Sequence, residues 1–207
     1  MIDYKFILVI VIAYFMGNIS PSTIQAKKSG VDIKSEGSGN AGTTNAFRVL
    51  GAKAALITLV VDVGKGVLAV FMGEIFSTHL AAMYCVLAVL LGHVFPVIYK
   101  FKGGKGVAVA FGATVAIDWR MGLCLLAVVL TVFLITKTVS MAALVGTISY
   151  PLVAYFFEPD FFHIGTVAAA IVLFMHRSNI KRIIHGDEQK IVRSRKKGED
   201  VEDIEDI

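Results

Sequence analysis

Charged side chains are scarce in this chain of 207 residues. Asp, Glu, Lys and Arg together make up 17% of it, and hydrophobic residues make up 56%. The mean hydropathy is +0.74. A soluble globular domain carries about 25% charged residues and about 45–50% apolar ones. The shortage of charge therefore argues against a soluble domain and indicates a protein of the lipid bilayer.

Cysteine is almost absent. Cys85 and Cys124 are the only two in the chain, and both lie within apolar runs. This argues against a disulfide framework or a cysteine-rich metal site, and we expect both thiols to pack as small apolar side chains. No cluster of metal-ligating residues is visible in the sequence either, so we predict no metal site and no cofactor.

Long runs without charge are abundant, by contrast. They occupy residues 6–16, 54–61, 81–92, 122–135, 141–157 and 164–175. With their flanks, most reach the roughly 20 residues that a membrane-spanning helix needs, and they lack the alternation of a barrel strand. The first run has no basic region before it and no cleavage site of small residues after it. We therefore interpret it as a span rather than a signal peptide.

The positions of the basic residues orient these spans. We predict an all-α polytopic integral membrane protein with seven transmembrane segments, at about residues 5–24, 52–75, 79–99, 106–118, 120–137, 139–157 and 160–176. One side of the membrane then holds every Lys and Arg except Lys5, Lys65 and Arg120. Because cytoplasmic loops are rich in Lys and Arg, this arrangement puts the N-terminus outside and the C-terminus in the cytoplasm.

The fourth segment is the weak point of this topology, because its apolar part covers only residues 107–117. A helix of this length extends about 17 Å, whereas the hydrocarbon core is about 30 Å thick. The fourth and fifth segments could be partly re-entrant, which leaves five spans as the alternative. An odd number keeps Lys53 and the basic C-terminal region on the same side.

The chain divides into one membrane-embedded domain and a tail. Residues 1–188 form the domain, which would hold any catalytic site. Residues 189–207 are first basic and then acidic, with almost nothing to bury. We predict that they form a charged, disordered cytoplasmic extension.

Polar residues gather in three stretches on the predicted cytoplasmic side. The first, SEGSGNAGTTNAFRVLG at residues 35–51, has glycines at 37, 39 and 42, where we expect positive φ and close approach to a ligand. Successive backbone amides and a helix starting near Thr43 would favour an anion. The stretch also offers the side chains of Ser38, Asn40, Thr43, Thr44, Asn45 and Arg48. A flexible loop with a helix cap is the alternative.

The second stretch is GHVFPVIYKFKGGKGVAVAFG at residues 92–112, with Lys105 set among three glycines before a helix. Exposed amides, a helix N-terminus and a movable ammonium group again favour an anion. The stretch does not match G-x-x-x-x-G-K-[ST], which argues against a nucleoside triphosphate. A loop that is basic only because it faces the cytoplasm would explain the lysines but not the glycines.

The third stretch, HRSNIKRIIHGDE at residues 176–188, follows the last span. His176 and Asn179 lie one turn apart on the same helix face. We expect the neighbouring Arg177, Lys181 and Arg182 to anchor this helix at the membrane interface, with a part in catalysis as the alternative. Ser140, at the start of the sixth span, could line the same site.

Two charged residues lie deeper. Asp62 and Lys65 are three positions apart within the second span, where ionisable groups are normally paired or face a polar cavity. We expect an ion pair, with direct contact to a substrate as the alternative. The tetrapeptide GKGV at residues 64–67 occurs again at 104–107, but the surrounding residues do not repeat.

The three stretches closely resemble the signature motifs of the bacterial acyl-phosphate:glycerol-3-phosphate acyltransferases, the PlsY family. The resemblance runs from about residue 14 to residue 188, in the same order and spacing. It implies an enzyme of the bacterial cytoplasmic membrane, with its active site facing the cytoplasm. Such an enzyme transfers a fatty acyl group from acyl phosphate to the 1-position of glycerol 3-phosphate, giving lysophosphatidic acid and phosphate. We expect membrane lipid around it, no nucleic acid and no obligate protein partner.

The resemblance also implies roles for individual residues. The catalytic set would be Arg48, Lys105, His176 and Asn179. Substrates and their phosphates would be held by Ser38, Gly39, Asn40, Gly42, Thr44, Asn45, His93, Gly103, Gly104, Gly106, Ser140 and Glu188. The motifs do not separate the roles of His93 and Glu188.

A His-x-x-x-x-Asp dyad, which many glycerolipid acyltransferases use to deprotonate the hydroxyl, is missing, since no His has an Asp five residues later. Acyl phosphate is an activated mixed anhydride, so we expect catalysis mainly by positioning and charge stabilisation. The phosphate of the donor could accept the hydroxyl proton, and His176 is the alternative base.

A membrane transporter of a phosphorylated metabolite or lipid is the alternative function. Asp62 and Lys65 would suit it, because transporters place their sites near the midplane of the bilayer. The main polar stretches lie at one face instead, and no inverted repeat is visible. Lipid phosphatases and alcohol phosphotransferases are disfavoured because their clustered Asp-rich or Arg/His signatures are missing.

Overall fold

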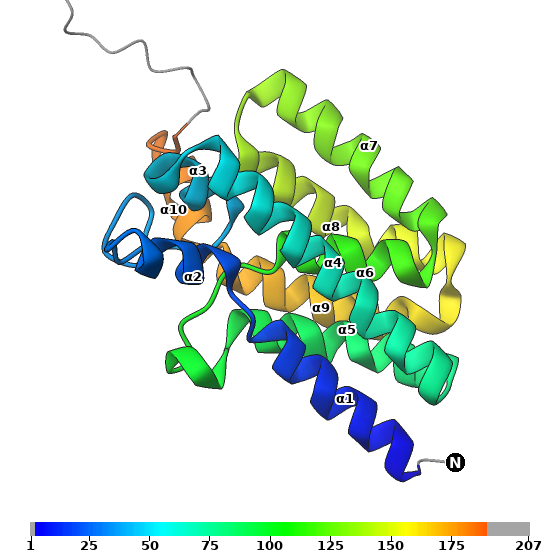
Figure 1. Ribbon diagram of the computed structural model, residues 1–207. Coiled ribbons are helices and arrows are strands. Elements are labelled where there is room, and N and C mark those ends of the chain that lie inside the picture. The colour runs from blue at the N-terminus through cyan, green and yellow to red at the C-terminus, as the bar shows by residue number, and fades with distance from the viewer. Residues whose placement is uncertain (1–2, 190–207) are drawn as a thin grey trace, which may run out of the picture.

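The computed structural model describes residues 3–189, and all the regular elements within them are helices (Figure 1). The longer helices are α1 (Tyr4–Gly17), α4 (Ala52–Phe76), α5 (His79–Val94), α6 (Val107–Ile117), α7 (Trp119–Thr136), α8 (Val139–Phe157) and α9 (Phe162–Met175). The shorter ones are α2 (Pro21–Lys28), α3 (Thr43–Leu50), α10 (Arg177–His185) and the single turns η1 (Val97–Tyr99) and η2 (Pro159–Phe161). The all-α expectation is confirmed. Of the predicted tail, all but residue 189 lies outside the described residues.

Five helical segments are long and apolar enough to cross a membrane. They are Tyr4–Lys28, Ala52–Phe76, His79–Tyr99, Trp119–Thr136 and Val139–Phe157. A sixth is obtained if Pro159–Met175 and Arg177–His185, which are bent by 57° relative to each other, form one span. α6 is shorter, at 11 residues. The lengths and composition of the helices therefore support a polytopic membrane protein.

The first expected span, residues 5–24, is not one continuous helix. α1 ends at Gly17, and α2 begins at Pro21. Proline lacks an N–H and suits the first position of a helix, but it breaks a helix interior. The carbonyl oxygens of Gly17 and Ile19, at this break, accept hydrogen bonds from Lys65 Nζ. The break thus leaves backbone acceptors that a buried ammonium group satisfies.

The short helix α6 lies against α4 at very close range. Gly66 of α4 faces the backbone of α6 at Val109, and Gly112 of α6 faces the backbone of α4 at Val63. A Cβ atom at either glycine would collide with these backbone atoms, and small residues commonly permit such approaches in membranes. This contact fixes the start of α6, and with it the loop at residues 103–106, beside α4.

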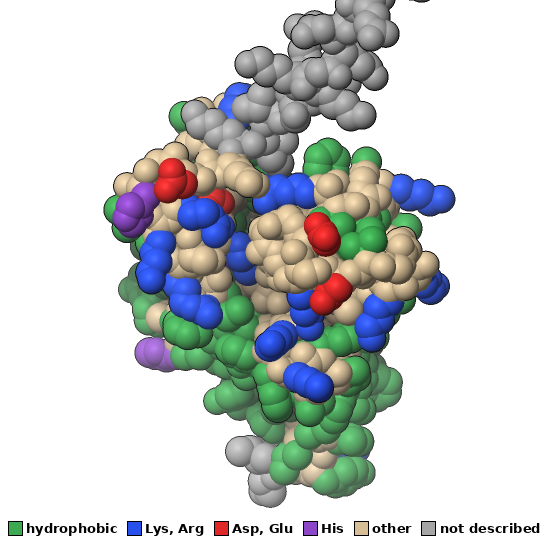
Figure 2. Space-filling view, turned by 90° about the vertical axis from the view of Figure 1, so that its left-hand side faces the viewer, with side chains coloured by type: hydrophobic (Ala, Val, Ile, Leu, Met, Phe, Trp, Pro, Cys, Tyr) green, Lys and Arg blue, Asp and Glu red, His purple; other side chains and the backbone are tan. Residues whose placement is uncertain are grey.

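The remaining helices complete a bundle. α1 packs on α5, α4 on α5 and α6, and α8 on α7 and α9. α2, α3 and α10 lie at one end of the bundle, and the N-terminal end of α1 lies at the opposite end (Figure 1). Figure 2 shows many Lys and Arg side chains on the face that α2, α3 and α10 form. The basic residues of several loops thus gather at one end of the molecule.

Candidate active site

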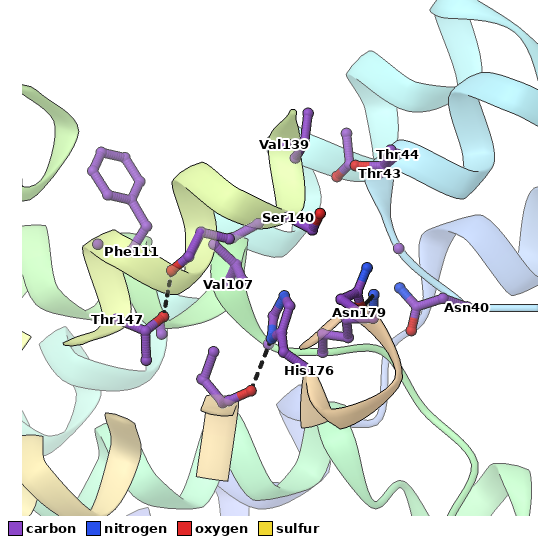
Figure 3. A pocket seen from close by; sticks show the side chains of 18 of the residues that line it. Asn40, Thr43, Thr44, Val107, Phe111, Val139, Ser140, Thr147, His176 and Asn179 are labelled. Atoms are coloured by element: carbon purple, nitrogen blue, oxygen red, sulfur yellow. Dashed lines mark hydrogen bonds between the residues drawn. The ribbon is translucent and has the colours of Figure 1, made fainter. Parts of the chain in front are cut away.

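A cavity of about 470 Å³ receives side chains from all three polar stretches of the sequence. Asn40 and Arg48 come from the first stretch, Lys105 from the second, and His176 and Asn179 from the third. Figure 3 shows Asn40 and Asn179, which come from segments distant in sequence, on one side of this cavity. The structure thus brings residues of all three stretches to one cavity.

Most of the residues expected in the site line this cavity. They are Ser38, Asn40, Gly42, Thr44, Asn45, Arg48, His93, Lys105, Gly106, Ser140, His176, Asn179 and Glu188. Gly39, Gly103 and Gly104 do not belong to the lining, in the part of the chain that is described. They shape its loops instead. Gly39 adopts a φ of 68°, and the N–H groups of Gly103 and Gly104 donate to backbone carbonyls at the end of α5.

Asn45 uses its side chain to hold the first loop in shape. Its Oδ1 accepts a hydrogen bond from the N–H of Ser38 at 2.8 Å. Its Nδ2 donates to the carbonyl oxygens of Ile33 at 3.0 Å and Glu36 at 3.1 Å. Gly37, with a φ of 60°, lies so close to Asn45 Oδ1 that a Cβ atom would collide with it. Asn45 therefore contributes to the site by positioning the loop.

The expectation of positive φ is confirmed for Gly37 and Gly39 and is wrong for Gly42. Gly42 is the N-cap of α3 and has an extended backbone, with φ of −147°. A Cβ atom at Gly42 would lie 2.9 Å from Asn40 Nδ2. The absence of a side chain there serves close packing of the loop rather than an unusual backbone conformation.

Thr43, the first residue of α3, adds a hydroxyl group to the cavity. Its Oγ1 is buried and has no hydrogen-bond partner within the described residues. It adjoins the N-terminus of α3, where backbone N–H groups have no partner inside the helix. A bound anion would satisfy both kinds of donor.

A chain of hydrogen bonds links the second and third stretches. Lys105 Nζ donates to Asn179 Oδ1 at 2.5 Å, and Asn179 Nδ2 donates to Glu188 Oε1 at 2.7 Å. Ser140 Oγ donates to the same oxygen at 2.6 Å, and Arg182 Nε donates to Glu188 Oε2 at 2.7 Å. Glu188 therefore orients three cavity residues, and one of them orients Lys105.

Arg182 is a cavity residue that we did not include among the expected site residues. We expected it to anchor α10 at the membrane interface, but it lines the cavity and forms an ion pair with Glu188. Arg182 follows Asn179 by three residues and so lies on the same helix face. This spacing is the sequence feature from which its place in the cavity could have been predicted. Arg177 and Lys181, on other faces of α10, are exposed.

The ionisation of the site follows from these contacts. Burial lowers the pKa of Lys105 to about 8, and the charges of Arg182 and Arg48 act in the same direction while Glu188 opposes them. Burial acts to raise the pKa of Glu188, but hydrogen bonds from Ser140, Asn179 and Arg182 outweigh it and hold the pKa below its usual value. Lys105 is thus an ammonium group that a phosphate dianion would stabilise in its charged form.

His176 separates α9 from α10 and is buried at the cavity (Figure 3). Its Nδ1 lies 2.8 Å from the carbonyl oxygen of Val172. A carbonyl oxygen only accepts hydrogen bonds, so Nδ1 carries the proton and the neutral ring keeps a lone pair on Nε2. His176 is therefore held in a tautomer that is able to accept a proton or a hydrogen bond through Nε2.

His93 connects the buried charges to the second stretch. Lys65 Nζ lies 2.8 Å from Asp62 Oδ1, which confirms the expected ion pair, and 2.9 Å from His93 Nδ1. Because an ammonium group only donates, His93 Nδ1 accepts and its Nε2 carries the proton. A Cβ atom at Gly104 would collide with this Nε2. The imidazole thus packs against the loop that carries Lys105.

Most of the remaining lining is apolar. Its walls include Leu59 of α4, Phe111 of α6, Leu126 of α7, Ala143 of α8 and Val172 of α9. In Figure 3, Phe111 lies on the side opposite to Asn40 and Asn179. A cavity with cations and donors at one end and hydrocarbon walls at the other suits an amphiphilic ligand with an anionic head.

The model of the family described as "Glycerol-3-phosphate acyltransferase" matches residues 7–186. The chain belongs to the glycerol-3-phosphate acyltransferase family. A glycerol-3-phosphate acyltransferase of Clostridioides difficile (strain 630) is 41% identical over 199 residues, covering 91% of this chain and 96% of that protein. A relative of the same name from Thermoanaerobacter sp. (strain X514) is 40% identical over 188 residues, covering 89% and 95%.

Solved structures agree with this membership. The crystal structure of PlsY (YgiH), an integral membrane glycerol 3-phosphate acyltransferase, in its glycerol 3-phosphate form has a TM-score of 0.86 and 33% sequence identity. The match covers 90% of this chain and 96% of PlsY. Its lysophosphatidic acid form has a TM-score of 0.82 at the same identity, covering 89% and 94%. The chain is thus an integral membrane acyltransferase of this family.

Proposed function

We propose that the chain takes the acyl group from acyl phosphate when it acylates the 1-hydroxyl of glycerol 3-phosphate, and that it releases lysophosphatidic acid and inorganic phosphate. One observation carries this proposal: a single cavity joins cationic and hydrogen-bonding groups to apolar walls. Acyl phosphate has an anionic head on a hydrocarbon chain and would satisfy both parts. The PlsY structures similar to this chain are described as glycerol 3-phosphate and lysophosphatidic acid forms, an acceptor and a product of such a transfer.

In the proposed step, the 1-hydroxyl oxygen attacks the carbonyl carbon of acyl phosphate. An ester C–O bond forms, and the anhydride bond between the carbonyl carbon and the phosphate oxygen breaks. The phosphate leaves with the electron pair, and the hydroxyl proton passes to this phosphate or to His176 Nε2. Because the donor is already activated, positioning and stabilisation of developing charge would supply most of the catalysis.

We assign the charged contacts to Arg48 and Lys105, each of which would balance phosphate charge. Backbone amides at residues 38–42, with the start of α3, would donate to phosphate oxygens. Asn179 and Glu188 would hold Lys105 in place, as their hydrogen bonds indicate. Lys, Arg and amide groups are sufficient to hold phosphate, so we expect EDTA to leave the activity unchanged.

A phosphate-release assay with palmitoyl phosphate, with and without glycerol 3-phosphate, tests the activity on purified protein. We expect release to depend on glycerol 3-phosphate and to match the amount of lysophosphatidic acid formed. Release that does not need glycerol 3-phosphate would indicate a phosphatase. Acyl transfer from an acyl thioester but not from the acyl phosphate would reject the proposed donor.

The destination of the proton is tested with His176→Ala, and His185→Ala serves as a control because His185 is exposed on the same helix. If the donor phosphate takes the proton, His176→Ala keeps a near-normal kcat at saturating substrate. A large loss of kcat with little change in KM would instead show that His176 is the base.

We also propose seven membrane crossings within a single domain at residues 1–188, with the N-terminus outside and the cavity facing the cytoplasm of a bacterial cytoplasmic membrane. Two observations support this topology. The start of α1 and α10 lie at opposite ends of the bundle, as an odd number of crossings requires (Figure 1). The basic residues gather at the α10 end, which fits the cytoplasmic side.

Cysteine labelling in intact cells tests this orientation. Ser29→Cys and Asp160→Cys place a thiol at exposed positions near opposite ends, in a background in which Cys85 and Cys124 are replaced by Ala. A membrane-impermeant maleimide should label position 160 and leave position 29 unlabelled until the membrane is opened. The reverse pattern would invert the topology.

A further inference from the structure

The apolar part of the cavity ends part-way along the helices that enclose it. The deepest lining residues in the described chain are Leu125 on α7, Tyr150 on α8 and Ala168 on α9. About one turn further along these helices, the side chains no longer line the cavity and lie in the hydrophobic core, to which Leu125 and Tyr150 also belong. These core residues are Met121, Val153 and Ile164. The cavity therefore has a floor, and Tyr150 is its largest side chain.

The depth of this floor matches one leaflet of a membrane. Ser140 contributes to the polar end of the cavity and Tyr150 to the floor, and both belong to α8. The rise of an α-helix puts them about 15 Å apart along the helix axis. This is half of the roughly 30 Å hydrocarbon core of a bilayer, the depth that the acyl chains of one leaflet occupy.

The floor is rigid. Tyr150 is buried, and its hydroxyl lies 2.5 Å from Thr114 Oγ1, which donates to the carbonyl oxygen of Ala110 at 2.7 Å. Because Thr114 has one proton and directs it to Ala110, Tyr150 is the donor of this pair. The tyrosine ring also packs edge-on against Phe161, with centroids 6.2 Å apart. A hydrogen bond at one end and an aromatic contact at the ring fix its position.

The wall above Tyr150 offers a ligand little except hydrocarbon. Thr147, one turn away on α8, donates its hydroxyl proton to the carbonyl oxygen of Ala143 at 2.7 Å (Figure 3). Gly146 has no side chain, and a Cβ atom there would lie 2.6 Å from Val129 Cγ2 of α7. The space beside Gly146 is therefore narrow and would be closed by a larger residue.

We propose that Tyr150 sets the length of the acyl chain that the enzyme accepts, by closing the apolar end of the cavity. The inference rests on the proposed function, because it assigns this end to the acyl chain of the donor. A chain that reaches the floor fills the cavity, and a longer one has to bend or displace the ring. Pocket size discriminates between chains that differ by a methylene unit by about tenfold or more.

The experiment measures kcat/KM for lauroyl, myristoyl, palmitoyl, stearoyl and arachidoyl phosphate in detergent, with glycerol 3-phosphate saturating. Tyr150→Ala removes the floor but leaves Thr114 bonded to Ala110. We expect the ratio of stearoyl to myristoyl use to rise by about tenfold or more. Tyr150→Phe keeps the ring and removes the hydroxyl, so it should retain the wild-type length profile.

A second variant should shift the preferred acyl chain toward shorter lengths. Gly146→Leu fills the cavity one turn above the floor, and its length profile should shift toward lauroyl phosphate by a similar factor. If Tyr150→Ala fails to fold, this variant decides the question. An unchanged profile in a folded Tyr150→Ala or Gly146→Leu protein that still transfers myristoyl groups would overturn the inference alone. Wild-type protein that transfers no acyl group from any of these donors would overturn the proposed function and the inference with it.

Discussion

The tetrapeptide GKGV occurs twice in this chain, at residues 64–67 and 104–107, and each copy contains one lysine. Lys65 lies inside α4, and its Nζ meets Asp62, His93 and the backbone carbonyls at the break between α1 and α2, at 2.6–3.1 Å. Lys105 lies in the loop before α6, and within the described residues its Nζ has one hydrogen bond, to Asn179. The ammonium group of Lys65 therefore has all its hydrogen bonds satisfied by the protein. That of Lys105 is held in place by one hydrogen bond and keeps N–H groups available for a ligand.

The difference between the two lysines shows how the partners of a buried ammonium group decide whether it stabilises the fold or is available to a ligand. An ammonium group with an ion pair and three further acceptors in contact has no capacity left for a ligand. An ammonium group that burial and neighbouring cations destabilise gains the most from an incoming anion. The two lysines are also connected, because Lys65 contacts His93 and His93 packs against Gly104, the residue before Lys105.

The largest effect is expected from Lys65→Met, which leaves Asp62 buried without its cation. Breaking a buried ion pair by removing one partner lowers the free energy of unfolding by about 3–5 kcal/mol. Thermal unfolding in detergent measures this loss. Asp62→Asn combined with Lys65→Met removes both charges and should recover part of the stability. A double variant no more stable than the single one would show that Lys65 acts through its size rather than its charge.

Lys105→Met should have the opposite profile, with a large loss of activity and little loss of stability. Removing one preorganised donor from an active site typically reduces the rate by about 10²–10³-fold. Steady-state acyl transfer and thermal unfolding, measured on the same preparation, separate the two effects. Lys102→Met is the matched control, because Lys102 precedes the same loop and is exposed. A loss of stability as large as that of Lys65→Met would remove the distinction between the two lysines.

The pH dependence of acyl transfer tests the state of Lys105 more closely. With a pKa of about 8, Lys105 is charged at lower pH and becomes neutral as the pH rises through this value. We expect kcat/KM for glycerol 3-phosphate to fall above about pH 8, by up to about tenfold per pH unit for a single proton. Lys105→Arg keeps its charge at this pH, so any activity it retains should not decline in this range. The same decline in both proteins would assign the titration to another group.

The smallest effect is expected from removal of the charged tail. We predict that removal of residues 190–207, the charged end of the chain, changes kcat/KM by no more than about twofold, since this sequence is highly charged and has almost nothing to bury. Acyl transfer by the truncated protein measures this directly. A tenfold loss would give the tail a part in the reaction.

Most of the fold could be predicted from the sequence, because the length and apolarity of a membrane helix are local properties. Each of the seven expected segments overlaps one of the longer helices. The prediction that residues 5–24 form one continuous helix was wrong. The helix is interrupted before Pro21, and the interruption is stabilised by Lys65, which lies far along the chain. Likewise, Arg182 resembled an interfacial anchor because its partner Glu188 reaches it only when the chain turns after α10.

The residue types by themselves pointed only to three stretches, and the resemblance to a family supplied most of the individual lining residues. Glycines, hydroxyls and cations in SEGSGNAGTTNAFRVLG indicate an anion site by their types alone. Asn45 shapes the loop, whereas the Thr43 hydroxyl has no partner among the residues that the structure describes, and this difference depends on which atoms come within hydrogen-bonding distance. The floor at Tyr150 could not be foreseen, because it depends on how deep the space between α7, α8 and α9 extends.

The sequence by itself determined that this is a helical membrane protein and indicated an anion-binding end, because hydropathy, glycine content and charge are properties of the residues along the chain. Only the tertiary structure decided which of two identical GKGV tetrapeptides would be structural. The physical reason is that the state of a buried ammonium group is set by its partners. The partners of Lys65 and Lys105 come from helices and loops that only folding brings to them.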